Sequence, residues 1–261
     1  MNSRLVEIDM MSHESIFTHI AERYKYIDQS SWDVINQIDL KPEELISIIT
    51  TSLGKDKKTQ LGISILAFHY IWNHQNIRIA QQILKLLFTS GEEILHPFYY
   101  FMQSKACHFN GEYDLSLELL EKAEVKLKSI NGHTDYRQLL ICIGSLNDTD
   151  PEGIECAVMK AIIANDKGNN YHSIGQYDKA IGEFTCALNL QSESYSTMCH
   201  ANIAYTRRCM AKSLEAKGIH DKALEQYKLA NSIANDIYRN ESHPEVTEIK
   251  AALTRSACNS I

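Results

Sequence analysis

Histidine and cysteine are the residue types in this chain with the widest chemistry, and their spacing decides whether they can use it. The chain has 11 histidines and 7 cysteines. A helix brings two metal ligands together when they are three or four residues apart, but His69 and His74 are five apart, and Cys107 and His108 are adjacent. There is no CxxC or HExxH spacing. We therefore predict no metal site and no cofactor.

Residues 54–59 are the segment most similar to a phosphate-binding loop. Their sequence, Gly-Lys-Asp-Lys-Lys-Thr, lacks the earlier glycine and the preceding strand of such a loop, so we interpret it as a solvated turn between helices. A Gly-x-Ser-x-Gly elbow, a Rossmann fingerprint and a kinase signature are also missing. We predict no catalytic residue and no enzyme activity. The alternative is an enzyme whose groups come from distant positions, which would need a deep pocket lined by convergent titratable groups.

The overall composition favours helices. Four prolines and 11 glycines in 261 residues are too few for the many tight turns of an all-β protein, and a hydrophobic fraction of 44% is ample for a packed core. The net charge of −7 disfavours a nucleic-acid partner, because nucleic-acid affinity depends largely on clustered Lys and Arg.

Three features predict a cytoplasmic location and no membrane partner. No stretch approaches the roughly 18–20 apolar residues of a membrane-spanning helix. The N-terminal segment 1–15 has acidic residues where a secretory signal would need an apolar run. The 7 cysteines are odd in number and lie singly, unlike a secreted disulfide framework, so we expect reduced thiols.

The chain repeats itself in its C-terminal half. Segments 175–187 and 218–230 each contain a glycine, then Asp-Lys-Ala, then an aromatic residue and a further alanine, all at equal offsets. A small residue lets one helix lie close against another, and an aromatic residue one turn later fills the gap to the next pair. The spacing therefore predicts successive pairs of closely packed helices.

These residues resemble the pattern of the tetratricopeptide repeat (TPR) family. The resemblance implies an all-α fold, namely a TPR-like α-α superhelix in which antiparallel helix pairs form a solenoid. The matching residues are Gly168, Tyr171, Ala180, Phe184 and Ala187 in one copy, and Ala211, Leu214, Ala223, Tyr227 and Ala230 in the next.

Earlier and less regular copies precede these two. The small residue of each second helix is Ala80, Ser116, Ala180 or Ala223, so the steps are 36, 64 and 43 residues, and the middle step contains an extra helix or an eroded hairpin. The predicted boundaries are 1–57 for an N-terminal helical cap or subdomain, 58–237 for the repeats (about 58–90, 97–130, an irregular 131–160, 161–194 and 204–237) and 243–258 for a C-terminal capping helix.

Two narrower resemblances cover parts of the chain. The long second helix before His243-Pro-Glu-Val246 is similar in spacing to kinesin-light-chain-like TPR repeats. Segment 110–127, with the aromatic residues that precede it, resembles bacterial Rap-type peptide-regulated TPR proteins. The Rap resemblance implies an N-terminal helical bundle that acts on a response regulator, with no catalytic residue that we can place.

TPR geometry implies that the first helix of each pair lines a concave groove. Asn side chains there could hold a peptide backbone, and Lys or Arg its carboxylates. This is similar to the carboxylate clamp of chaperone-binding TPR domains, which Asn169, Arg208 and Lys212 match, whereas Asn165 stands where the clamp has a lysine. The implied groove residues are Phe98, Phe101, Lys105, His108, Asn165, Asn169, His172, Tyr205, Arg208 and Lys212, of which Phe98, Phe101 and Tyr205 are also expected to be partly core.

We therefore predict a scaffold or adaptor that binds a protein or peptide, acidic or with a free carboxylate, in this groove. The alternative is a Rap-type regulator of a bacterial signalling partner, in which a short peptide shifts the arrangement of the N-terminal helices. A bound peptide that changes helix packing would separate the two.

Overall fold

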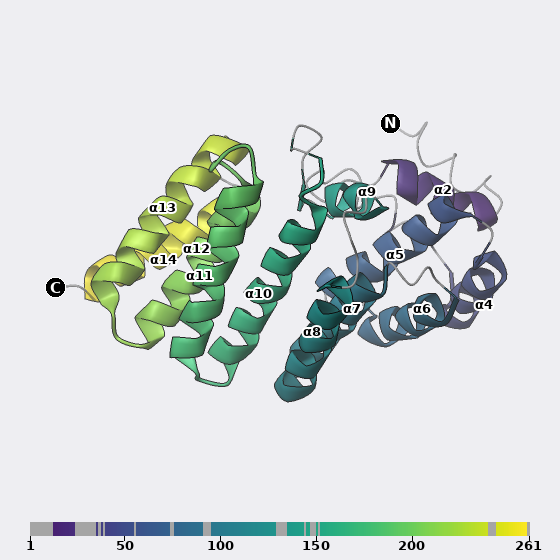
Figure 1. The fold of residues 1–261 in the computed structure, drawn as a ribbon, viewed down its shortest axis with the longest axis horizontal. Coiled ribbons are helices and arrows are strands. Elements are labelled where there is room, and N and C mark those ends of the chain that lie inside the picture. The colour runs from purple at the N-terminus through teal and green to yellow at the C-terminus, as the bar shows by residue number, and fades with distance from the viewer. Residues whose placement is uncertain are drawn as a thin grey trace. The chain divides into compact units, whose positions relative to one another are not determined.

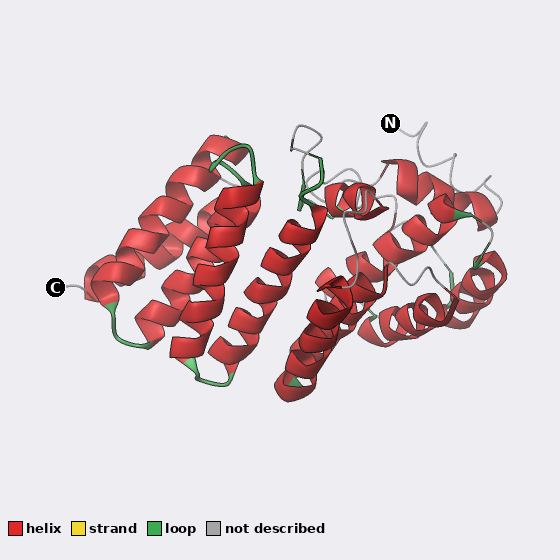
Figure 2. Ribbon diagram, viewed as in Figure 1, coloured by secondary structure: helices red, strands yellow, loops and turns green. Residues whose placement is uncertain are grey.

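The protein is described by a computed structural model in which the described residues form helices and the turns between them (Figure 2). The structure describes residues 13–23, 35, 38, 40–54, 56–73, 76–90, 95–128, 135–143, 145–146, 150, 152–239 and 244–259, and these contain no strand. The helices are α2 (His13–Arg23), α4 (Pro42–Ser52), α5 (Lys57–Trp72), α6 (Ile77–Ser90), α7 (His96–Phe109), α8 (Tyr113–Lys128), α9 (Asp135–Cys142), α10 (Glu155–Ser173), α11 (Tyr177–Ser194), α12 (Ala201–Ala216), α13 (His220–Tyr238) and α14 (Pro244–Asn259). The predicted all-α fold class is confirmed.

The helices fall into two compact units. Unit 1 comprises residues 1–112 and 121–148, and unit 2 comprises residues 113–120 and 149–261, so that α8 is shared between them.

Unit 1 is arranged around α5, which packs against α2, α6, α7 and α9. Asp56 begins α5 as its N-cap, because its carboxylate accepts a 2.8 Å hydrogen bond from the backbone N–H of Thr59. The closest approach in the unit is at Gly62, where a Cβ atom would lie 1.9 Å from the carbonyl oxygen of Phe17 in α2. Only glycine therefore allows α2 and α5 to meet at this point.

Unit 2 consists mainly of two antiparallel helix pairs, α10 with α11 and α12 with α13, followed by α14, which packs on α13. In the view of Figure 1, α12 and α14 lie behind α11 and α13. Phe184 packs with Ala180 and Cys209. Tyr227 packs with Ala223 and with Ala252 of α14. The small residues of the repeat pattern, with Phe184 and Tyr227, thus lie in the buried core of this unit.

The turns within three helix pairs have the same geometry. In each, the backbone N–H after a glycine donates to a carbonyl five residues earlier, at 2.8 to 2.9 Å, which closes the preceding helix. The glycine needs a positive φ, which other residues adopt at a cost. The three are Gly111, Gly175 and Gly218, with φ of 80°, 78° and 83°.

Several predicted features lie wholly or partly outside the described residues. The described part of segment 131–160 holds one complete helix, α9, and the start of α10. Of the predicted N-terminal subdomain, residues 1–12 and 24–34 are outside the described part, and His243 and residues 129–134 are as well.

Candidate functional site

The ten predicted groove residues divide between the two units, four on α7 and six on α10 and α12. On α7, Phe98 and Phe101 are buried, as core residues are. Lys105 is also buried, with its ammonium 4.9 Å from the centroid of the Trp72 ring and 5.9 Å from that of Phe109. His108 is the most accessible of the four. The contacts of α7 therefore hold a cation against aromatic rings within unit 1.

In unit 2 the predicted residues connect α10 to α12, the first helices of the two pairs. Asn169 of α10 donates to the Tyr205 hydroxyl of α12 at 3.0 Å, and His172 Nδ1 lies 2.9 Å from Ser213 Oγ. Burial, and secondly the charge of Lys212, lower the pKa of His172, which favours its neutral form. Burial also raises the pKa of Tyr205 well above its ordinary value, so its hydroxyl stays protonated. Neutral hydrogen bonds thus connect α10 to α12.

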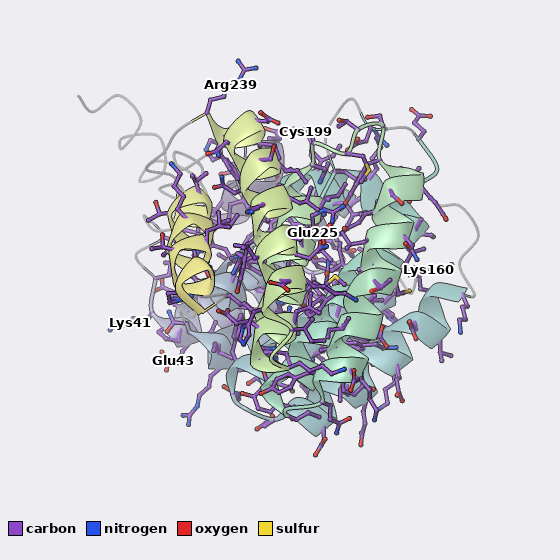
Figure 3. All side chains as sticks on the ribbon, turned by 90° about the vertical axis from the view of Figure 1, so that its left-hand side faces the viewer. Lys41, Glu43, Lys160, Cys199, Glu225 and Arg239 are labelled. Carbon is purple, nitrogen blue, oxygen red and sulfur yellow. The ribbon has the colours of Figure 1, made fainter. Side chains whose placement is uncertain are left out.

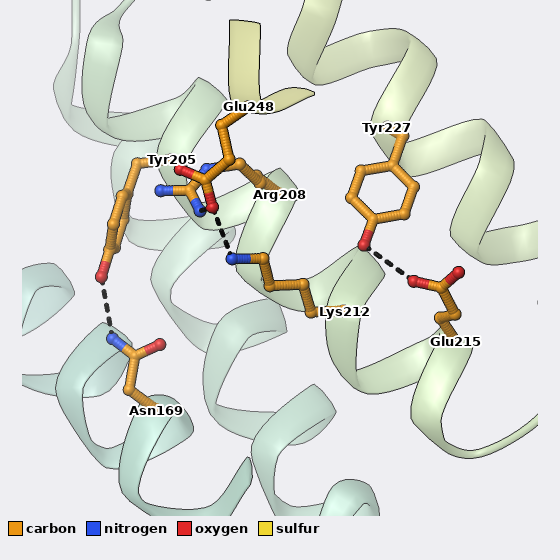
Figure 4. Close-up of polar contacts among 7 residues, drawn as sticks. All are labelled: Asn169, Tyr205, Arg208, Lys212, Glu215, Tyr227 and Glu248. Atoms are coloured by element: carbon orange, nitrogen blue, oxygen red, sulfur yellow. Dashed lines mark hydrogen bonds and ion pairs between the residues drawn. The ribbon is translucent and has the colours of Figure 1, made fainter. Parts of the chain in front are cut away.

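The charged contacts lie between α12 and α14 (Figure 4). A single oxygen, Glu248 Oε1, accepts hydrogen bonds from Arg208 and from Lys212, each at 2.7 Å. The Arg208 guanidinium also lies over the Tyr205 ring, 5.2 Å from its centroid. Burial alone would raise the pKa of Glu248, but the hydrogen bond from Lys212 and the charges of Arg208, Lys212 and Arg255 outweigh it, so the pKa is lowered.

Asn165 is the predicted residue with an unsatisfied polar atom. It is 5% exposed, and its Oδ1 atom has no hydrogen-bond partner among the described residues. A buried acceptor without a donor costs free energy, of the order of 1–3 kcal/mol. Asn165 thus differs from Asn169, whose amide is held by Tyr205.

Seven residues of α10, α12 and α14 form a surface that we call the polar face of unit 2. Its exposure is uneven, because the side chain of Arg208 is buried while those of Lys212 and Glu248 are 38% and 48% exposed. A ligand could therefore reach the ammonium and the carboxylate more easily than the guanidinium. The face comprises Asn165, Asn169 and His172 of α10, Tyr205, Arg208 and Lys212 of α12, and Glu248 of α14.

Sequence reasoning missed Glu248, although its signal is present. The predicted capping helix over 243–258 was assigned no binding residue. Lys212 and Glu248 are 36 residues apart, the same separation as Asn169 and Tyr205, which also meet across successive first helices. Opposite charges 36 residues apart, near the length of one repeat, were the available indication.

A second polar cluster in unit 2 was also missed. His200, the N-cap of α12, accepts the backbone N–H of Asn202 at Nδ1, and its Nε2 lies 3.7 Å from Asp150 Oδ2. Asp150 Oδ1 accepts a 3.3 Å hydrogen bond from Ser196. Both His200 and Asp150 are buried, so this pair ties residue 150 to the start of α12.

Neither a metal-binding cluster nor a membrane-spanning helix occurs among the described residues. In the part of the chain that the structure covers, His, Cys, Asp and Glu form no group of three or more that could hold a metal ion. None of the described helices has both the length and the apolar character needed to cross a membrane.

Comparison with known proteins identifies the fold. No family model and no curated protein sequence matches the chain. Among solved structures, BtubC (BKLC) from P. vanneervenii is similar with a TM-score of 0.57 and 13% identity, over 96% of this chain and 85% of that one. A kinesin-light-chain-type protein of Podosopora anserina with nearly identical TPR-like repeats has a TM-score of 0.50 and 15% identity, over 88% and 100%.

The apo form of RapI is similar as well. Its TM-score is 0.55 at 14% identity, with 95% of this chain covered but only 59% of RapI. At these identities the likeness concerns the fold alone. The chain has a TPR-like helical solenoid fold, as the repeat pattern predicted, and both narrower resemblances of the sequence have structural counterparts.

Proposed function

We propose that this protein is an interaction scaffold or adaptor that binds a protein segment or peptide through the polar face of unit 2. The observation that carries the proposal is the pair of cations, Arg208 and Lys212, converging at 2.7 Å on one carboxylate oxygen. A carboxylate is what this pair binds within the chain, so an acidic side chain or a free C-terminus is the ligand chemistry that fits.

Two further features support a peptide as the ligand. Charge-assisted hydrogen bonds are shorter and stronger than neutral ones, and such a contact can anchor an extended segment at one point. TPR-like solenoids present long surfaces built from successive helices, which suit extended segments. A cytoplasmic location and the absence of a nucleic-acid partner remain part of this proposal.

The test compares two lysines that are similarly exposed and that each form one ion pair within the chain. Lys212 is 38% exposed and bonded to Glu248, and Lys217, near the end of α12, is 37% exposed and bonded to Asp178. Peptides are first selected on the wild-type protein from a random library displayed with free C-termini. Their affinities for wild type, Lys212→Gln and Lys217→Gln are then measured by fluorescence anisotropy.

We expect Lys212→Gln to weaken binding about two- to fivefold, the size of an ion pair that reaches solvent, and Lys217→Gln to leave it unchanged. Equal affinities for all three proteins would remove the polar face from the binding site. Melting curves of both variants check that neither has lost its fold.

The alternative function is a Rap-type peptide-sensing regulator, favoured by the likeness to RapI over 95% of this chain. In that case a selected peptide should also change the packing of α2 and α4 in unit 1. Hydrogen exchange of these helices with and without the peptide distinguishes the two functions, because a plain adaptor leaves their exchange rates unchanged.

A further inference from the structure

We infer that Glu248 is a built-in competitor, whose carboxylate occupies the position that a partner's carboxylate must take. The inference rests on the proposed function and concerns the regulation of that same site. Glu248 comes from α14, a different helix from the one that carries the two cations. Its Oε1 atom alone receives both charged hydrogen bonds (Figure 4).

The competitor can leave without moving its helix. α14 is held by buried apolar contacts, with Val246 and Ile249 against Ala204 and Ala230, and with Ala252 in the cluster around Tyr227. These contacts involve neither Arg208 nor Lys212. A rotation of the Glu248 side chain therefore breaks its hydrogen bonds to Arg208 and Lys212 while α14 stays docked.

The exposure of the Lys212–Glu248 pair means that exchanging this contact for another costs little free energy. The Glu248 side chain is 48% exposed and that of Lys212 is 38% exposed. Ion pairs that reach solvent in this way contribute little to stability, because water and salt screen them. An incoming carboxylate replaces one such contact with another.

The charge of Glu248 weakens the attraction between the nearby cations and an incoming anion. Arg208, Lys212 and Arg255 all act on Glu248 as positive charges, and its carboxylate offsets part of that charge. While Glu248 is in place, the cations attract an anion less strongly than they would alone. Glu248 thus lowers the affinity of the site for carboxylates, so that a ligand must present its carboxylate in good geometry to bind.

An opposite role for Glu248 would leave a different signature. If its exposed carboxylate contacted a basic residue of the partner directly, removing the charge would weaken binding. If it served only to hold α14, its removal would lower the melting temperature and leave the affinity for peptides unchanged.

The experiment measures peptide affinity for three further variants. Glu248→Gln removes the charge and keeps the shape, and Glu248→Ala removes the acceptor. Glu225→Gln is the control, because it removes one exposed carboxylate from α13, where Figure 3 shows Glu225. The probe is the tightest fluorescein-labelled peptide selected on wild type, in one form with its carboxylates and in another with each replaced by a carboxamide.

We expect Glu248→Gln and Glu248→Ala to bind the carboxylate peptide about two- to fivefold more tightly than wild type, and Glu225→Gln to match wild type. The gain should vanish for the carboxamide peptide and shrink in Lys212→Gln/Glu248→Gln, because the two residues act on one contact. Weaker or unchanged binding by Glu248→Gln overturns the inference. If Lys212→Gln still weakens peptide binding in that case, the proposed function stands. Insensitivity to both, or a selection that enriches no peptide, overturns both.

Discussion

The imidazole of His200 lies flat against the phenol ring of Tyr195, with the ring centroids 3.7 Å apart and an angle of 5° between the planes. Because His200 Nδ1 accepts a hydrogen bond from the Asn202 backbone, the proton of the neutral ring is on Nε2, which faces Asp150. Burial lowers the pKa of His200 and the charge of Asp150 raises it, with burial the larger effect. His200 is therefore neutral in the folded protein near pH 7.

This pKa shift predicts that acid destabilises the fold. The unfolded chain binds a proton at His200 as the pH falls through about 6.5, whereas the folded chain, with its lowered pKa, does not. Stability is thus lost as the pH falls, by about 1 kcal/mol between pH 7.5 and pH 5.5 for this group. His200→Asn keeps an N-cap side chain but cannot titrate, so it should reduce the loss by that amount.

Urea unfolding followed by circular dichroism at both pH values measures the effect. Some acid sensitivity should remain in the variant, because burial also lowers the pKa of His69 in unit 1, to about 4. Equal losses of stability in wild type and His200→Asn would contradict the prediction.

A second prediction compares two glycines inside helices. A Cβ atom at Gly168 of α10 would lie 2.6 to 2.8 Å from ring atoms of the fully buried Phe184, whereas one at Gly182 of α11 would meet nothing within 4 Å. Gly168→Ala should therefore destabilise by about 1–3 kcal/mol through overpacking. Gly182→Ala should stabilise by up to about 1 kcal/mol, because alanine favours the helix.

Thermal melting of both variants decides this comparison. A melting temperature for Gly168→Ala at or above that of wild type would show that Phe184 can move aside. It would also mean that the close approach of α10 and α11 does not require glycine.

The contrast between these glycines explains how much of the fold could be predicted. A small residue at 168 and an aromatic residue at 184 are properties of single positions at fixed offsets, so a repeat pattern reveals them. Their burial follows directly from the way in which helix pairs stack. The fold was therefore predictable without knowing how any polar side chain is oriented.

The polar contacts were less predictable, for a physical reason. Arg208 and Glu248 are 40 residues apart and His200 and Asp150 are 50 apart, so neither pair is set by a local spacing in the sequence. Long side chains on a helix face can also turn to solvent. The pattern indicated which residues face the same side of unit 2, but not that one cation pair already holds a carboxylate of the chain itself.

A third prediction separates the two cations by their effect on stability. Arg208 is buried, stacked on Tyr205 and bonded to Glu248, so a carboxylate placed there would be buried beside another carboxylate. Arg208→Glu should cost about 3 kcal/mol or more. Lys212→Glu, at a position 38% exposed, should cost about 1 kcal/mol or less.

Melting curves of the two variants provide the check, and a similar loss in both would contradict the assigned difference in burial. The distinction matters for binding experiments. Loss of binding by Arg208→Glu would report unfolding as much as a lost contact, so Lys212 is the better residue for testing the site.

A fourth prediction concerns a buried hydrogen bond between α11 and α12. Gln191 Nε2 donates to Thr206 Oγ1 at 3.0 Å, and the Thr206 hydroxyl lies 2.7 Å from the Asn202 carbonyl oxygen, to which it can donate. Both Gln191 and Thr206 are buried. Thr206→Val keeps the shape but leaves the Gln191 amide without this acceptor, so it should cost about 1–3 kcal/mol.

Replacing both partners should cost less than the two single changes together. In Thr206→Val/Gln191→Leu no amide is left unsatisfied, and two apolar side chains of similar size face one another, so part of the lost stability should return. Urea unfolding of the two single variants and the double variant measures this coupling. If the effects simply add, the amide of Gln191 finds another partner when Thr206 is absent, and the hydrogen bond does not specify how α11 packs on α12.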